Sequence, residues 1–190
     1  MAHALAHGHN PLLTDAIWAP TGLNLAWVTT TPALAFLFAP VTWLFGPVAA
    51  YNTAAILMPA TSAWTMFLLC RYLTRRLWPS IFGGYLFGFS SYLIGHMIGE
   101  LHLTSVFLLP PLTLVIVRFV RGETSARRLI VQAGVLLGLE LYLSTEIAFT
   151  LTLALIGALL VGYATLPAFR ERLVTTTIRL IAAYADRKST

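Results

Sequence analysis

The chain has few charged residues and almost no cysteine. Only 10% of its 190 residues are charged, whereas 58% are hydrophobic. Because about a quarter of the residues in a typical soluble domain are charged, this chain cannot cover a water-facing surface, and most of its exterior must face lipid. The single cysteine, Cys70, excludes an internal disulfide framework and gives no metal–thiolate pattern.

The net charge of +5 does not indicate nucleic acid as a partner, because the basic residues form no single block. They fall into three short clusters between apolar runs, which is typical of topology signals in membrane proteins. The lipid bilayer is therefore the expected environment.

Crossing the hydrocarbon core of a bilayer takes roughly 20 apolar residues in a helix. Three such stretches are Val48–Cys70, Pro79–Met97 and Leu103–Val120. The run 129–166 would be about 57 Å long as one helix, so it must fold back, and Ser144-Thr145-Glu146 is the best break. The expected fold is all-α: a polytopic transmembrane helix bundle with about five spans plus an outer interfacial helix.

These spans place all 12 lysines and arginines on one side, in groups of three, four and five. The positive-inside rule makes that side cytoplasmic. We expect a multi-pass protein of the plasma (inner) membrane with its N-terminus outside and its C-terminus in the cytoplasm. The expected regions are an outer loop (1–29), an interfacial or re-entrant helix (30–46), the transmembrane bundle (47–167) and a cytoplasmic amphipathic tail (168–190). If residues 30–46 instead cross, there are six spans and the N-terminus lies inside.

The outer-side segments also resemble a known family. In order, they read HGHNPLLTDAIWAPTGLNLAW, PALAFLFAPVTWLFGPVAAYN, RYLTRR and FGFSSYLIGHMIGELHLTSVFLLPPL. This order resembles the polytopic glycosyltransferases of the GT-C class, particularly the actinobacterial membrane proteins related to protein mannosyltransferases and lipid A aminoarabinose transferases. The resemblance implies sugar transfer from a polyprenyl-phosphate donor on the outer membrane face.

The resemblance also implies that parts of such an enzyme lie outside this sequence. The family's first helix, the acidic motif after it and the C-terminal part have no counterpart here. We therefore expect a fragment that is inactive alone or that needs a partner chain to supply the missing helix. A phosphate leaving group needs cations, and the expected outer side offers only histidines, or a divalent metal ion held by histidines and carboxylates. The alternative is a small non-enzymatic membrane protein, such as a transporter subunit or an assembly partner.

Six residues are candidates for the site. Asp15, Glu100 and Glu146 are candidate catalytic carboxylates, and His96, His102 and Glu140 are candidate substrate-binding residues. Asp15 can equally cap a helix. His96 and Glu100 share a helix face, and His102 follows closely, but a solvated turn between spans also explains them. Glu140 lies within a span, where a carboxyl group faces a cavity or partner or packs as a protonated, hydrogen-bonded residue. Glu146 is also explained as a turn residue.

Overall fold

The computed structural model describes residues 1–15, 18–27, 31–165, 167 and 170–171. Most of the expected cytoplasmic tail lies outside the described residues. The elements, in chain order, are α1 (Ala2–Ala6), β1 (Leu13–Thr14), β2 (Leu23–Asn24), η1 (Leu25–Trp27), α2 (Pro32–Leu37), α3 (Ala39–Thr74), α4 (Leu77–Gly88), α5 (Ser91–His96), η2 (Leu101–Thr104), η3 (Val106–Leu108), α6 (Leu109–Val120), α7 (Ala126–Leu143) and α8 (Thr145–Thr165), where η marks a 3-10 turn. The two short strands pair antiparallel, and the predicted all-α class is confirmed.

The segment expected to lie at the interface forms α2 and the start of α3. Gly46 adopts φ 86° and ψ 169°, so its backbone breaks α3 into a short first part and a long second part. A positive φ of this size is accessible to glycine at little cost. The long part, from Pro47 to Thr74, rises about 42 Å and contains the predicted span Val48–Cys70.

The predicted span Pro79–Met97 is wrong as a single helix. The helix α4 ends at Gly88, and α5 begins anew at Ser91. The Ser90 hydroxyl accepts a hydrogen bond from the Leu93 N–H at 3.5 Å, as an N-cap residue does. The sequence Ser90-Ser91 therefore stops one helix and starts another.

Glycines let α4 pack against the long part of α3. A Cβ atom on Gly84 would lie 2.6 Å from the Ala63 carbonyl oxygen, and one on Gly88 would lie 2.6 Å from the Pro59 carbonyl oxygen. Small residues at this four-residue spacing allow close helix approach in membranes. By contrast, Gly134 and Gly138 on α7 have open space where a Cβ would be.

The predicted fold-back of the last apolar run is confirmed. The helix α7 ends at Leu143 and α8 begins at Thr145. Between them, the Ser144 hydroxyl accepts from the Ile147 N–H at 3.3 Å and caps α8. The two helices pack side by side as a hairpin.

Three helical stretches among the described residues are long and apolar enough to cross a bilayer, fewer than the five expected. They are Ala39–Thr74, Leu101–Val120 and Thr145–Thr165. The helix α4, with 12 residues, is too short by itself. The helix α7 has 18 residues but carries Arg127, Arg128 and Glu140. The number of candidate spans is lower than predicted because the segment 79–97 is interrupted and α7 carries three charged residues.

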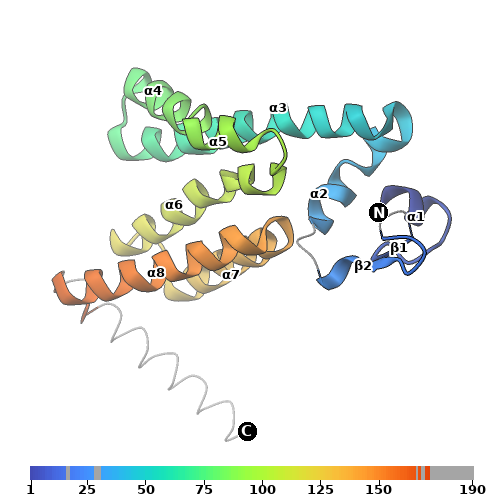
Figure 1. The fold of residues 1–190 in the computed structure, drawn as a ribbon. Coiled ribbons are helices and arrows are strands. Elements are labelled where there is room, and N and C mark those ends of the chain that lie inside the picture. The colour runs from blue at the N-terminus through green and yellow to red at the C-terminus, as the bar shows by residue number, and fades with distance from the viewer. Residues whose placement is uncertain (16–17, 28–30, 166, 168–169, 172–190) are drawn as a thin grey trace, which may run out of the picture.

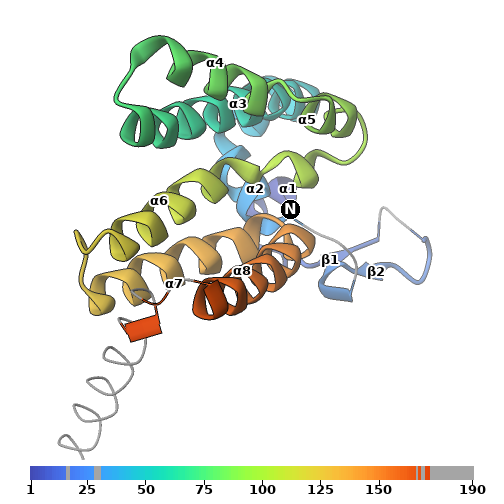
Figure 2. The same cartoon turned by 90° about the vertical axis from the view of Figure 1, so that its left-hand side faces the viewer.

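Basic and polar side chains lie at opposite ends of the helices that Figures 1 and 2 show. The basic end comprises arginines at the ends of α3 and α6, in the turns after them and at the start of α7: Arg71, Arg75, Arg76, Arg118, Arg121, Arg127 and Arg128. The opposite end carries the polar rim, defined as Tyr92, His96, Glu100, His102 and Glu146. Along α3, the rise from Tyr51 beside the rim to Tyr72 at the basic end is about 32 Å, close to the thickness of the hydrocarbon core.

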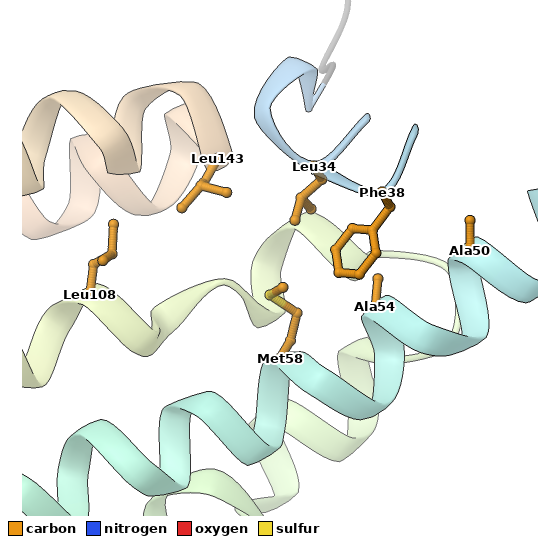
Figure 3. Packing of buried hydrophobic residues seen from close by; sticks show 7 residues of the cluster. All are labelled: Leu34, Phe38, Ala50, Ala54, Met58, Leu108 and Leu143. Atoms are coloured by element: carbon orange, nitrogen blue, oxygen red, sulfur yellow. The ribbon is translucent and has the colours of Figure 1, made fainter. Parts of the chain in front are cut away.

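A buried apolar cluster fastens α2 to the bundle near the rim (Figure 3). It joins residues of α2, α3, η3 and α7, with Phe38 at the α2–α3 junction: Leu34, Phe38, Ala50, Ala54, Met58, Leu108 and Leu143. The cluster joins segments that are far apart in the sequence and so holds α2 close to the residues of the rim.

Candidate functional site at the polar rim

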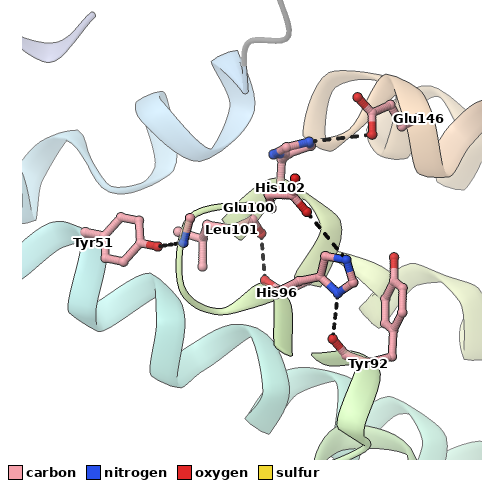
Figure 4. Close-up of polar contacts among 9 residues, drawn as sticks. Tyr51, Tyr92, His96, Glu100, Leu101, His102 and Glu146 are labelled. Atoms are coloured by element: carbon pink, nitrogen blue, oxygen red, sulfur yellow. Dashed lines mark hydrogen bonds and ion pairs between the residues drawn. The ribbon is translucent and has the colours of Figure 1, made fainter. Parts of the chain in front are cut away.

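The rim begins with a loop that a tyrosine on α3 holds in place. The Tyr51 hydroxyl donates to the Met97 carbonyl oxygen at 2.7 Å and accepts from the Gly99 N–H at 3.1 Å (Figure 4). Gly99 turns the chain with a φ of 101°. Tyr51 therefore positions the segment that carries Glu100 and His102. Sequence reasoning missed it, because no local pattern links residues 46 positions apart.

His96 and Glu100 meet at the end of α5. Their Nε2 and Oε2 atoms are 3.5 Å apart, but the predicted shared helix face is wrong, because α5 ends at His96 and Glu100 lies beyond the turn that follows it. The other ring nitrogen of His96, Nδ1, lies 2.8 Å from the Tyr92 carbonyl oxygen, and its ring contacts the Tyr92 ring. A hydrogen bond on Nδ1 orients the imidazole toward the Glu100 carboxylate. The glutamate side chain keeps 59% of its surface exposed.

The second pair joins segments distant in sequence. His102 Nε2 on η2 lies 3.7 Å from Glu146 Oε2 in the first turn of α8. The histidine side chain is only 19% exposed, whereas that of the glutamate is 52% exposed. Glu146 lies in the first turn of α8, at the end of the helix that carries partial positive charge. The fold-back of α7 and α8 thus delivers the carboxylate to the rim.

An apolar groove runs from the rim down one side of α8, and we call it the α8 groove. Its volume is about 530 Å³. Ser90, Tyr92 and Glu146 supply its polar mouth. Its walls are mainly apolar: Phe87, Leu93, Leu103, Val106, Leu109, Ile147, Thr150, Leu151 and Ala154. A site of this shape fits an amphiphile whose tail lies along the helix and whose headgroup meets the rim.

A second cavity of about 500 Å³ lies beside α2. It is lined by Tyr51, Gly99 and His102, together with Thr31 and Thr42 and further residues of α2 and the N-terminal segment. Since His102 lines this cavity and its partner Glu146 lines the groove, the pair stands between the two spaces. The structure therefore brings four of the six candidate residues into two adjacent histidine–glutamate contacts.

Comparisons of the chain with protein-family models, with curated proteins and with solved structures found no match. The resemblance to GT-C glycosyltransferases stays an interpretation of the sequence. Any function assigned to the rim must accordingly be argued from its own geometry.

The structure places the other two candidates away from the rim. Asp15 is exposed after β1 and lines a cavity with Met1, His9 and Asn10 of the N-terminal segment. Glu140 is fully buried in α7, and neither carboxyl oxygen has a hydrogen-bond partner among the described residues. Their predicted catalytic and substrate-binding roles stay predictions.

Among the described residues, the basic side chains at the rim are histidines. All lysines and arginines follow residue 70, and those that the structure describes near the bundle belong to the basic end. Among the described residues, no group of three or more histidine, cysteine or acidic side chains is arranged to hold a metal ion. In the part of the chain that the structure describes, His96 and His102 are therefore the rim side chains that could carry positive charge.

Proposed function

We propose that this chain is the membrane-embedded, lipid-binding part of a glycosyl-transfer protein, and that it binds a polyprenyl-phosphate sugar. The observation that carries the proposal is the α8 groove, which is apolar along α8 and ends at Glu146 beside His102. An isoprenoid tail matches the apolar wall, and the phosphate and sugar then lie at the polar rim. Sugar hydroxyls are suitable donors to the Glu100 and Glu146 carboxylates.

The proposed topology has five crossing segments. α3, η2 to α6, and α8 meet the requirements of length and apolarity. α4 with α5 leads from Arg76 at the basic end to His96 at the rim, and α7 leads back from the basic end to Ser144. Arginines at the start of α7 can reach the interface while their aliphatic stems stay in the bilayer. The basic end then faces the cytoplasm and the N-terminus lies outside.

The proposed role in transfer is binding and orientation of the donor. A carboxylate such as Glu146 can accept the proton of an acceptor hydroxyl. The departing phosphate must be stabilised by positive charge, however, and among the described residues the basic side chains at the rim are His96 and His102. Transfer is therefore expected to require a further chain or a divalent cation. The same shortage of cations favours the second candidate function, a non-enzymatic assembly partner that presents a lipid to another protein.

Filling the α8 groove is expected to remove lipid binding. Ala154 lines the groove and is exposed, so Ala154→Trp places an indole where the tail would lie. The neighbouring Leu153 is exposed but does not line the groove, and Leu153→Trp is the matched control. We expect Ala154→Trp to weaken binding of a fluorescent polyprenyl phosphate in detergent micelles by about tenfold or more, as a lost apolar site would.

The control variant should bind within about twofold of the unaltered chain, since a difference of that size is below about 0.5 kcal/mol. Equal binding by both variants would place the lipid elsewhere and remove the support for the proposed function. A phospholipid without a prenyl tail that competes equally well would contradict the choice of substrate class.

A further inference from the structure

A cluster at the basic end is independent of the rim and of the function proposed for it. We call it the Tyr72 cluster, and it consists of Tyr72 on α3 with Arg118, Arg121 and Glu123 from α6 and the turn after it. The guanidinium carbons of Arg118 and Arg121 lie 5.1 Å and 5.0 Å from the centre of the Tyr72 ring. Both contacts fall within the range in which a cation is attracted to an aromatic face.

The charge of this cluster is incompletely neutralised. The Tyr72 hydroxyl donates to Glu123 Oε2 at 2.6 Å, which ties the nearby carboxylate to the tyrosine. Among the described residues, no carboxylate oxygen lies within 4.0 Å of either guanidinium. Both arginines are exposed. Two cations are thus held at one ring, with donors free to bind an anion.

The depth of the cluster identifies the anion. Tyr72 lies about 32 Å along α3 from Tyr51, one hydrocarbon thickness from the rim. Groups at that level meet the phosphates of the membrane lipids. Basic side chains there attract anionic headgroups, and a guanidinium matches a phosphate geometrically because it can donate two parallel hydrogen bonds.

We infer that the Tyr72 cluster is a binding site for the phosphate of an anionic phospholipid on the side of the membrane opposite the polar rim. Tyr72 on α3 positions Arg118 and Arg121 through its ring, and the two guanidinium groups bind the lipid phosphate at the end where α3 and α6 meet. The site acts independently of what the rim binds.

The test measures phosphatidylglycerol and phosphatidylcholine binding by the purified full chain in mixed micelles. The variant Arg118→Gln/Arg121→Gln is expected to lower phosphatidylglycerol affinity about tenfold or more. The matched control Arg127→Gln/Arg128→Gln removes the same charge from α7 and is expected to lower it less than about threefold. Tyr72→Leu removes no charge, yet it should lower affinity as the first variant does, with unchanged elution on size exclusion.

Three outcomes would overturn the site. The control pair of substitutions could lower affinity as much as the Arg118/Arg121 pair, which would show general attraction to a basic surface. Phosphatidylcholine could bind as tightly as phosphatidylglycerol. Finally, free glycerol phosphate at millimolar concentration could displace the lipid, which would assign the cluster to a soluble phosphate instead.

Discussion

Glu140→Leu is expected to make the protein more stable. The carboxyl group is fully buried and neither oxygen has a hydrogen-bond partner among the described residues. A buried polar group without a partner costs about 1–3 kcal/mol, and leucine of similar size removes that group without leaving a large cavity. The free energy of unfolding should therefore rise by about 1–3 kcal/mol, measured by thermal or denaturant unfolding in detergent micelles.

Glu100→Leu is the matched control, because it makes the same change at an exposed side chain. Its effect on stability should stay within about 0.5 kcal/mol. Destabilisation by Glu140→Leu would show that the carboxyl group is held by a partner in the membrane. A residue that lowers the stability of a protein is expected where function requires it. The Glu140→Leu variant should therefore also be assayed for polyprenyl-phosphate binding.

His102→Ala is expected to weaken polyprenyl-phosphate binding by about ten- to a hundredfold. A hydrogen bond to a charged group contributes about 1.5–3 kcal/mol, and the rim contains no lysine or arginine to replace the imidazole. Loss of His102 also leaves Glu146 without its partner at 3.7 Å, so the carboxylate would repel the phosphate. The measurement is the dissociation constant for the fluorescent polyprenyl phosphate in micelles.

The control for this prediction is His9→Ala, which removes an exposed histidine of the N-terminal segment. Its affinity should equal that of the unaltered chain. If both substitutions weaken binding equally, or if neither does, the phosphate is not bound at the rim.

Periodicity and length were sufficient to predict the helical class and the last hairpin. A run of apolar residues too long for one crossing had to fold back. The polar residues at Ser144 were the place where a turn would cost the least free energy. Fewer of the described helices are long and apolar enough to cross a bilayer than the five predicted, for two reasons. Ser90 caps a new helix inside an otherwise apolar run, and Arg127, Arg128 and Glu140 make α7 too charged for a span judged by composition alone.

The candidate site was only partly predictable for a related reason. His96 and Glu100 are four residues apart and meet across the turn after α5, so their contact depends on local sequence. The contact of His102 with Glu146 and the anchoring of the loop by Tyr51 depend on how distant segments pack. The burial of Glu140 likewise depends on its neighbours in space. The sequence shows a carboxyl group within an apolar run, but not the side chains that surround it.

In the proposed topology the polar rim and the basic end lie on opposite sides of a membrane. In a Cys70→Ala background, single cysteines at Ile98 beside the rim and at Thr124 between α6 and α7 report the two ends. A membrane-impermeant maleimide added to intact cells is predicted to label Ile98→Cys directly and Thr124→Cys only after permeabilisation. Labelling of both positions from the same side, or of Thr124→Cys alone in intact cells, would contradict the proposed arrangement.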